Sequence, residues 1–454
     1  MLVSTNPHNG EHINSYATFN KAEIYTALNA ANRQFQSWQL TSFEQRAQTL
    51  KAVAAALRND KENLAHLMAI EMGKPLKEGL AEVEKAAWCA EHYADNAKSY
   101  LANEEIESDA VESYVCYQPL GSILGILPWN APVWLAFRFL APSLMAGNTC
   151  IMKHDPSVQG CANAIMNAFK SAMAPDNIVV NLPIDNTEVA NIIKDRRIKG
   201  VSFTGSSATG AKVASVAGSV IIPSVLELGG SDPCVILADA ELEKAADIAC
   251  LSRIINAGQS CIAAKRIIVE APVYEQFITL LEDRLARLVV GNPLEQNSQI
   301  GPLARQDIQH NLHRQVSQSL EQGANCLLGG ELPVDNPGYY YPVTLLTDVT
   351  PTMTVFNEET FGPVMCVCKA EDADAALELA NHTVYGLGAA IWSKDLRQQQ
   401  KFVEQLQAGQ VSVNGIVKTD PRLPSGGIKN SGIGRELGPH GIRQFVNCKQ
   451  VWIG

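Results

Sequence analysis

Residues 200–210 have the sequence Gly-Val-Ser-Phe-Thr-Gly-Ser-Ser-Ala-Thr-Gly. The run 200–204 has the composition of a buried strand, and a helix is expected from about Ala208. The glycines between them would let backbone amides and a helix N-terminus approach a phosphate. The segment is neither G-x-G-x-x-G nor a P-loop, so on its own it also fits an ordinary strand-to-helix turn.

The same alternation of strand and helix continues on both sides of this segment. Before it, apolar runs predict strands at 123–127, 150–153 and 178–181, with helices at 162–170 and 187–194. After it, strands are expected at 233–237, 265–270, 387–392 and 411–413, with helices at 241–251, 274–288 and 396–406. Such alternation is typical of parallel sheets covered on both faces. Two α/β blocks that meet near residue 229 therefore predict two domains with a cleft between them.

The first hundred residues are predicted to be helical. Leu50, Val53 and Leu57 follow at helical spacing after Thr41 and Glu44, whose separation suits a capping box. The chain has 454 residues, enough for two or three domains with a large buried core and no need of a disulfide or metal staple.

Composition excludes several classes of function. Lys and Arg total 36 against 47 Asp and Glu, a formal charge of −11, so neither nucleic acid nor an anionic membrane is an expected partner. Residues 120–152 are apolar and long enough to span a bilayer, but three prolines and Arg138 interrupt them, which favours a buried segment of a soluble enzyme. The 11 cysteines include no C-x-x-C pair, which fits a reducing compartment such as the cytoplasm. No metal site is expected, because His310 and His313 lack a third ligand nearby.

Three residues have settings that suit catalysis. Cys261 follows small residues and Gly258, in a loop that could approach a substrate closely, and its thiolate would be a nucleophile. Glu227 lies in an apolar run before two glycines, where burial would raise its pKa and make it a general base. Asn130 lies on a proline-stiffened loop and could donate to a developing oxyanion. Each also has an ordinary interpretation, namely a buried cysteine, a surface acid and a structural turn.

No single motif decides the function, but seven occur together and in order. They are E-M-G-K-P at 71–75, P-W-N at 128–130, F-T-G-S at 203–206, E-L-G-G at 227–230, G-Q-S-C at 258–261, E-E-T-F-G-P at 358–363 and G-G-I-K-N-S-G-I-G-R-E at 426–436. With this set the chain resembles the aldehyde dehydrogenase superfamily over essentially its whole length. The overall pattern is most similar to a shorter bacterial type of succinate-semialdehyde dehydrogenase.

The resemblance implies an α/β fold of three parts. A Rossmann-like dinucleotide-binding domain would comprise residues 1–101 and 120–229, and an α/β catalytic domain would comprise residues 230–430. A small β oligomerisation arm would combine residues 102–119 with residues 431–454. By the same resemblance the protein would be a homodimer or a homotetramer.

Carried over position by position, the resemblance makes Cys261 the nucleophile that attacks an aldehyde carbon. Asn130 and the backbone N–H of Cys261 would stabilise the oxyanion. Hydride would pass to a nicotinamide, and Glu227 would then activate water to release a carboxylic acid. Relatives that transfer the acyl group to coenzyme A tend to lack this acid, so its presence favours hydrolysis.

The resemblance also implies a set of cofactor contacts. Lys153 and Glu359 would hold the adenine-side and nicotinamide-side ribose hydroxyls, respectively. Gly205 and Ser206 would form the turn that binds the pyrophosphate. Ile126, Trp129 and Phe361 would line the channel, and Gly229 would pass close to the nicotinamide. Many NAD-preferring relatives have Glu three residues after the lysine, where this chain has Pro156. Asp155 could still repel a 2′-phosphate, so the sequence favours NAD and leaves NADP open.

The expected substrate class rests mainly on Arg138, eight residues after Asn130. Succinate-semialdehyde dehydrogenases carry an Arg at the matching position, where it binds the substrate carboxylate, and an Arg fork suits that group. Trp134 and Ser425 would complete the substrate site. A core or interface ion pair is the alternative role for this arginine. Ile255 stands where some relatives have a second Arg, and Ser425 stands where many have an aromatic residue.

The leading hypothesis is therefore NAD(P)-dependent oxidation of succinate semialdehyde to succinate through a thioester on Cys261. Oxidation of uncharged aliphatic or aromatic aldehydes, with Arg138 used structurally, is the rival within the family. A dinucleotide-binding protein without turnover is the rival outside it. The presence of Cys261, Glu227, Asn130 and Lys153 argues against that last reading.

Overall fold

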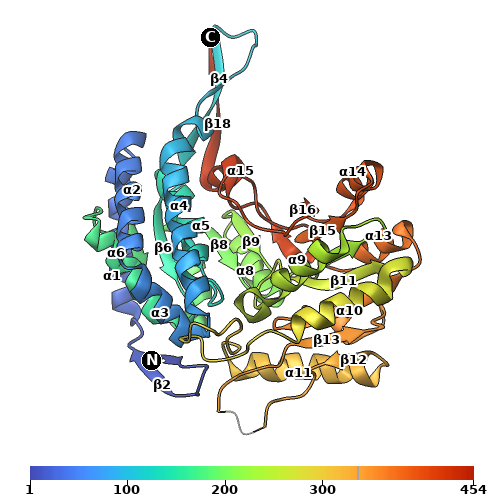
Figure 1. Ribbon diagram of the computed structural model, residues 1–454. Helices are drawn as coiled ribbons and strands as arrows, with labels where there is room; N and C mark the ends of the chain where they lie inside the picture. The colour runs from blue at the N-terminus through green and yellow to red at the C-terminus, as the bar shows by residue number, and fades with distance from the viewer. Residues whose placement is uncertain (335–336) are drawn as a thin grey trace.

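The computed structural model describes residues 1–334 and 337–454. Two large, mainly parallel sheets form the body, and a narrow third sheet extends from it (Figure 1). The first large sheet has the order β17-β9-β8-β5-β6-β7, in which only β17 is antiparallel to its neighbour. Its strands are β5 (Ser122–Ile126), β6 (Thr149–Lys153), β7 (Val179–Asn181), β8 (Ile198–Thr204), β9 (Ser224–Glu227) and β17 (Gly432–Ile433).

Helices cover both faces of this sheet, because each has an apolar stripe that needs burial. One face carries α2 (Phe43–Asn59), α3 (Lys61–Met72), α4 (Leu76–Tyr100), α5 (Pro132–Met145) and α6 (Gln159–Ser171). The other carries α1 (Lys21–Trp38), α7 (Val189–Ile193) and α8 (Ser207–Ser219). The strands predicted for this half of the chain are all present, with bounds shifted by one or two residues.

The start of α2 differs from the sequence-based prediction. Its N-cap is Ser42, whose hydroxyl accepts from the Gln45 N–H while the Gln45 side chain accepts from the Ser42 N–H. The predicted pair of Thr41 and Glu44 is therefore wrong by one residue. Thr41 Oγ1 instead donates to the Trp38 carbonyl at 2.5 Å, which closes the turn after α1.

The second large sheet has the order β12-β13-β14-β11-β10-β15-β16, and only β12 and β13 pair antiparallel. Its strands are β10 (Asp232–Ile236), β11 (Ala264–Glu270), β12 (Asn325–Leu328), β13 (Thr344–Thr347), β14 (Val364–Ala370), β15 (Gly388–Trp392) and β16 (Gln410–Val413). A single apolar core joins it to the helices α9 (Leu242–Ile254), α10 (Tyr274–Leu285), α11 (Gln306–Glu321), α12 (Thr354–Asn357), α13 (Ala373–Asn381) and α14 (Leu396–Gln405).

The third sheet contains β3 (Glu104–Glu105), β4 (Glu112–Pro119) and β18 (Val446–Ile453). β18 pairs with β4 along its whole length, and the pair projects away from the body (Figure 1). Residues 432–433 belong to the first large sheet and α15 (Gly438–Ile442) precedes β18, so only the end of segment 431–454 enters the third sheet. A short hairpin of β1 (Leu2–Thr5) and β2 (His12–Tyr16) begins the chain.

The apolar segment 120–152 folds inside the body. It forms β5, a turn, α5 and β6, and every residue of α5 is buried. Among the described helices, none combines the length and the apolar character needed to cross a bilayer.

Candidate active site

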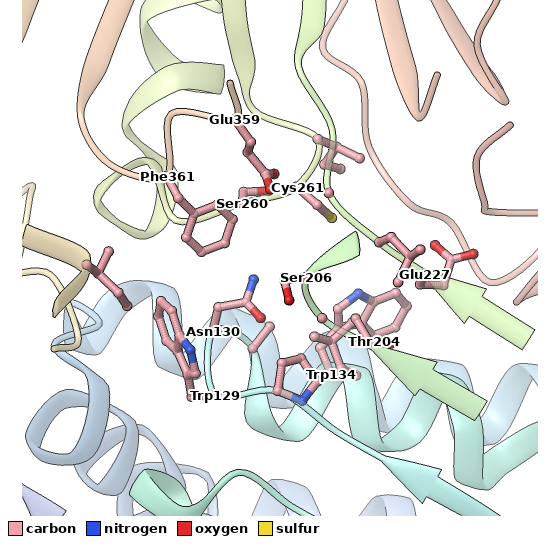
Figure 2. A pocket seen from close by; sticks show the side chains of 18 of the residues that line it. Trp129, Asn130, Trp134, Thr204, Ser206, Glu227, Ser260, Cys261, Glu359 and Phe361 are labelled. Atoms are coloured by element: carbon pink, nitrogen blue, oxygen red, sulfur yellow. The ribbon is translucent and has the colours of Figure 1, made fainter. Parts of the chain in front are cut away.

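A cavity of about 440 Å³ opens where the carboxyl ends of β5, β8 and β9 face the segment before β11 and the start of α11. Ser260 and Cys261 lie on one side of the open space, and Trp129 and Asn130 lie on the other (Figure 2). Most of the predicted site residues line it, namely Cys261, Glu227, Asn130, Trp129, Gly205, Ser206, Gly229, Glu359, Phe361, Arg138 and Trp134. Residues from both large sheets therefore meet in one cavity, as the sequence predicts.

Cys261 follows a strained loop. Asn256 and Ala257 have φ angles of 57° and 53°, in the left-handed region that side chains disfavour. Two hydrogen bonds hold this backbone. The Asn256 N–H donates to Glu78 Oε2 at 2.7 Å, and its Nδ2 donates to the Asn130 carbonyl at 2.7 Å. The loop is thereby fixed both to α4 and to the opposite wall of the cavity.

The Cys261 thiol is the nucleophile candidate, and its ionisation is suppressed. Burial raises its pKa to about 11, although the positive charges of Lys265 and Arg138 act in the opposite direction. At neutral pH the sulfur is therefore protonated in this structure. Attack on a carbonyl requires a base that accepts the thiol proton, and Glu227 lines the same cavity.

The Asn130 turn is fixed by a buried ion pair. Lys74 pairs with Glu82 and also donates to the Asn130 carbonyl at 3.0 Å. Glu82 Oε1 accepts from two backbone N–H groups in the first turn of α5, at 2.9 and 3.0 Å. A carboxylate at this position satisfies unpaired donors and complements the helix dipole. Asn130 Nδ2 itself donates to the Gln259 carbonyl at 3.1 Å, next to the nucleophile loop.

Glu227, at the end of β9, shares a buried cluster with Arg138 and Glu436. Arg138 Nη2 is 3.2 Å from Glu227 Oε2, and Arg138 Nε is 2.6 Å from Glu436 Oε2. Burial raises the pKa of Glu227 to about 7, although the Arg138 charge opposes the rise. A carboxyl group with this pKa can exchange protons near neutral pH, which a general base requires.

Arg138 lines the cavity, but its guanidinium already contacts two carboxylates. The ion pair that the sequence left as an alternative role is thus present, and Glu436 is a partner that the sequence did not identify. Arg138 Nη2 also lies 3.3 Å from Ser425 Oγ. Ser425 is buried behind Arg138 rather than in the cavity wall, so it can affect a substrate only through that arginine.

A second group of side chains surrounds Glu359. Its Oε1 accepts from the Gly230 N–H at 3.0 Å and from Lys265 Nζ at 2.9 Å. A Cβ atom at Gly229 would lie only 2.5 Å from Glu359 Oε2, so a larger residue there would displace this carboxylate. Lys265 Nζ also donates to the Cys261 carbonyl at 2.7 Å, which ties this group to the nucleophile loop.

The walls near α8 suit a dinucleotide. Ser206 is the N-cap of α8, and Gly205 and Ser206 line the cavity, so the start of this helix lies at the cavity wall. The rings of Trp129 and Phe361 meet edge to face with centroids 5.8 Å apart. A helix start, an apolar ring pair and the Glu359 carboxylate are features that suit a pyrophosphate, a base and a ribose, so these residues fit a dinucleotide.

Two predicted cofactor residues lie behind the cavity wall. Ile126 and Lys153 are paired in register at the ends of β5 and β6. Lys153 Nζ donates to Asn186 Oδ1 at 2.5 Å, and burial lowers the pKa of this lysine. Asp155 Oδ1 accepts from the N–H and the hydroxyl of Ser157 at 3.0 and 2.8 Å. The Asp155 carboxylate thus caps the short turn that begins at residue 156.

Sequence reasoning missed the buried charges around the site, which are Lys74, Glu82, Lys265 and Glu436, and the partly buried Glu78. Lys74 and Glu436 belong to the motifs at 71–75 and 426–436, so the sequence drew attention to these positions but did not identify the residues they pair with. Glu82 could have been found as an acid on the apolar stripe of a helix. Within the described residues, no group of three or more His, Cys, Asp or Glu side chains could hold a metal ion.

Comparison with known proteins covers the whole chain. The sequence profile of the aldehyde dehydrogenase family matches residues 2–451. A probable succinate-semialdehyde dehydrogenase [NADP(+)] of Synechocystis sp. is 44% identical over 452 residues, covering 100% of this chain and 99% of that protein. Succinate-semialdehyde dehydrogenase [NADP(+)] 1 of Mycobacterium ulcerans is 41% identical over 457 residues, covering 100% of both. The solved structure of succinic semialdehyde dehydrogenase from Streptococcus pyogenes with NADP+ matches at a TM-score of 0.97 and 31% identity, covering 100% of both chains.

Proposed function

The chain belongs to the aldehyde dehydrogenase family, and from that premise we propose that it oxidises succinate semialdehyde to succinate with NADP. NAD(P)-dependent oxidation of an aldehyde is the reaction of the family to which it belongs. The observation that carries the finer proposal is that Cys261, Asn130, Glu227 and Arg138 line one cavity. Relatives that match the full chain and bear the name of this substrate support it.

In the proposed reaction, Cys261 Sγ loses its proton to Glu227 or to water and bonds to the aldehyde carbon. Asn130 Nδ2 and the Cys261 N–H donate to the oxygen that becomes negative. The bound dinucleotide supplies the hydride acceptor. A thioester then remains on Cys261. After releasing to solvent any proton taken from the thiol, Glu227 accepts a proton from the water that attacks the thioester carbon. The C–S bond then breaks, the carboxylic acid leaves and the Cys261 sulfur is reprotonated.

The preference for NADP is proposed from the turn after β6. Pro156 stands where an acid would repel a 2′-phosphate, and Lys153 adds a positive charge beside it. The Asp155 carboxylate, on which the sequence-based preference for NAD depended, is engaged with Ser157 instead. Two full-length relatives named for NADP(+) support the same preference.

A second candidate substrate class is an uncharged aliphatic or aromatic aldehyde. The observation that favours it is the pairing of Arg138 with both Glu227 and Glu436, which gives this arginine a complete structural role. Apolar walls such as Trp134 and Leu135 would accept such a chain. The two candidates differ only in whether a carboxylate on the aldehyde raises kcat/KM.

The test is a comparison of kcat/KM for succinate semialdehyde and butanal, which has the same chain length without the carboxylate, each with NADP and with NAD. We expect at least about tenfold preference for the semialdehyde, the scale of a charged hydrogen bond, and a clear preference for NADP. Equal rates for the two aldehydes would contradict the proposed substrate. Cys261→Ala should bind the dinucleotide without turnover, whereas Cys448→Ser, at an exposed position, should keep the full rate.

A further inference from the structure

A lysine that the sequence did not single out contacts two residues of the cavity wall without lining the cavity itself. Lys85 lies on α4, and its Nζ donates to Thr419 Oγ1 at 2.7 Å. The same ammonium group lies 4.3 Å from the ring centroid of Trp134, on α5. Trp134 and Thr419 both line the cavity, together with Arg138. Segments far apart in the sequence thus bring one cation to the wall of the proposed active site.

The charge of Lys85 is not balanced by a contacting acid. Across residues 1–334 and 337–454, no carboxylate oxygen lies within ion-pair distance of its Nζ, whose contacts are a hydroxyl and an aromatic face. Burial and the nearby Arg138 charge lower the pKa of Lys85 to about 8, although the negative charges of Glu82 and Asp420, which do not contact it, act in the opposite direction. A partly buried ammonium group that no carboxylate contacts gains from an anion that reaches it.

Arg138 has the opposite balance. One guanidinium contacts two carboxylates, those of Glu227 and Glu436. A substrate carboxylate placed against Arg138 alone would make a third negative group around one positive charge. Like charges held close together in a buried site repel, so a further cation near the cluster favours the binding of another carboxylate.

We propose that Lys85 Nζ and Thr419 Oγ1 bind the terminal carboxylate of the substrate, beside Arg138 and against the Trp134 ring. Lys85 is then the residue that makes the enzyme specific for a carboxylated aldehyde. In this arrangement Arg138 mainly orients Glu227 and Glu436. The proposal rests on the proposed oxidation of succinate semialdehyde, because it assigns the charge that recognises that substrate.

The experiment compares Lys85→Met with the wild type, using succinate semialdehyde and butanal at saturating NADP. Met has an unbranched apolar side chain close in length to that of Lys, but it lacks the charged ammonium group. We expect KM for the semialdehyde to rise at least about tenfold, with kcat little changed and with butanal kinetics unaffected. Competitive inhibition by succinate should weaken by a similar factor. Lys85→Arg, which keeps the charge, should retain most of the preference for the semialdehyde.

Two further variants separate recognition from structure. Thr419→Val keeps the shape of the side chain and removes its hydroxyl, so it should raise KM for the semialdehyde by a smaller factor and spare butanal. Lys77→Met removes a positive charge from an exposed position of the same helix and should leave KM unchanged for both aldehydes. If Lys77→Met raised KM for the semialdehyde as much as Lys85→Met does, the cause would be the long-range effect of positive charge. The assignment of Lys85 would then be wrong.

The outcomes distinguish the two proposals. If the wild type prefers butanal or treats both aldehydes alike, the proposed substrate fails and the Lys85 assignment fails with it. If the wild type prefers the semialdehyde but Lys85→Met keeps that preference, only the Lys85 assignment is wrong. If Lys85→Met lowered kcat/KM equally for both aldehydes, and Lys85→Arg did not restore it, the role of this lysine would be structural, next to Trp134. That result would also overturn the inference.

Discussion

The Glu227 side chain is removed from water and lies beside a cation, two conditions with opposite effects on its charge. Burial and the negative charge of Glu436 favour the neutral acid, and Arg138 favours the carboxylate. The result is a pKa of about 7, far above that of a surface glutamate. A single residue can therefore give up and accept a proton within the pH range in which enzymes work.

We expect the hydrolytic step to follow the ionisation of Glu227. The deprotonated carboxylate accepts the proton from water, and burial keeps Glu227 neutral below its raised pKa. Where hydrolysis limits the rate, kcat should therefore rise with pH and level off above about 7. Steady-state rates in a series of buffers at constant ionic strength check this. A flat profile, or a kcat that falls as the pH rises, would show that another group is the base.

At the scale of elements, α4 connects the parts of the site. Glu78, Glu82 and Lys85 follow one another at spacings of four and three residues, which places them on one face of the helix. Glu78 contacts the nucleophile loop, Glu82 caps α5, and Lys85 contacts the loop that carries Thr419. One helix face thus fixes the relative positions of three segments that line the cavity.

Loss of the Glu82 carboxylate should destabilise the protein strongly. Glu82→Ala would leave Lys74 unpaired in a buried site and two N–H groups of α5 without acceptors. We expect the free energy of unfolding to fall by about 3–5 kcal/mol, measured by urea denaturation. Glu84→Ala, at a more exposed position of α4, removes ion pairs with Arg58 of α2 and Lys61 of α3 and should cost less than about 1 kcal/mol. Similar losses in the two variants would contradict the capping role of Glu82.

Local sequence patterns predicted the strands of this fold better than the helix ends. Buried parallel strands such as β5 and β6 are short apolar runs, which stand out in the sequence. The start of α2 was misplaced because Thr41–Glu44 and Ser42–Gln45 both have capping spacing, and only the structure shows which hydroxyl faces the helix. The antiparallel pair β12–β13 was not predicted, since it is short and one of its strands is only partly buried.

At the scale of the whole molecule, motifs predicted which residues line the cavity but not how their charges are paired. Arg138 and Glu227 are 89 residues apart, and Lys85 and Thr419 are 334 apart. Pairings over such distances depend on how the two sheets and the C-terminal segment are packed, which no local spacing encodes. The sequence therefore indicated a candidate nucleophile, base and oxyanion donor, and left the counter-ions unassigned.

The projecting sheet of β4 and β18 is a separate feature of the whole molecule. Val111 and Trp452 are 84% and 53% exposed there, and the outer edge of a sheet offers unpaired backbone groups to another chain. The expected homodimer or homotetramer stays a prediction, as do the domain boundaries. Both concern how copies and parts of the chain are arranged, and neither changes the chemistry of the cavity.

The measurement that tests the central claim most directly is mass spectrometry of Glu227→Gln mixed with succinate semialdehyde and NADP. With the nucleophile intact and Glu227 removed, water is left to accept the thiol proton, so we expect NADPH to form slowly, up to about one per active site, while a succinyl thioester accumulates on the peptide containing Cys261. Cys261→Ala with Glu227→Gln is the matched control and should form neither product. Continued turnover without a thioester, or an acyl group on a different residue, would contradict the assignment of Cys261 as nucleophile and Glu227 as base.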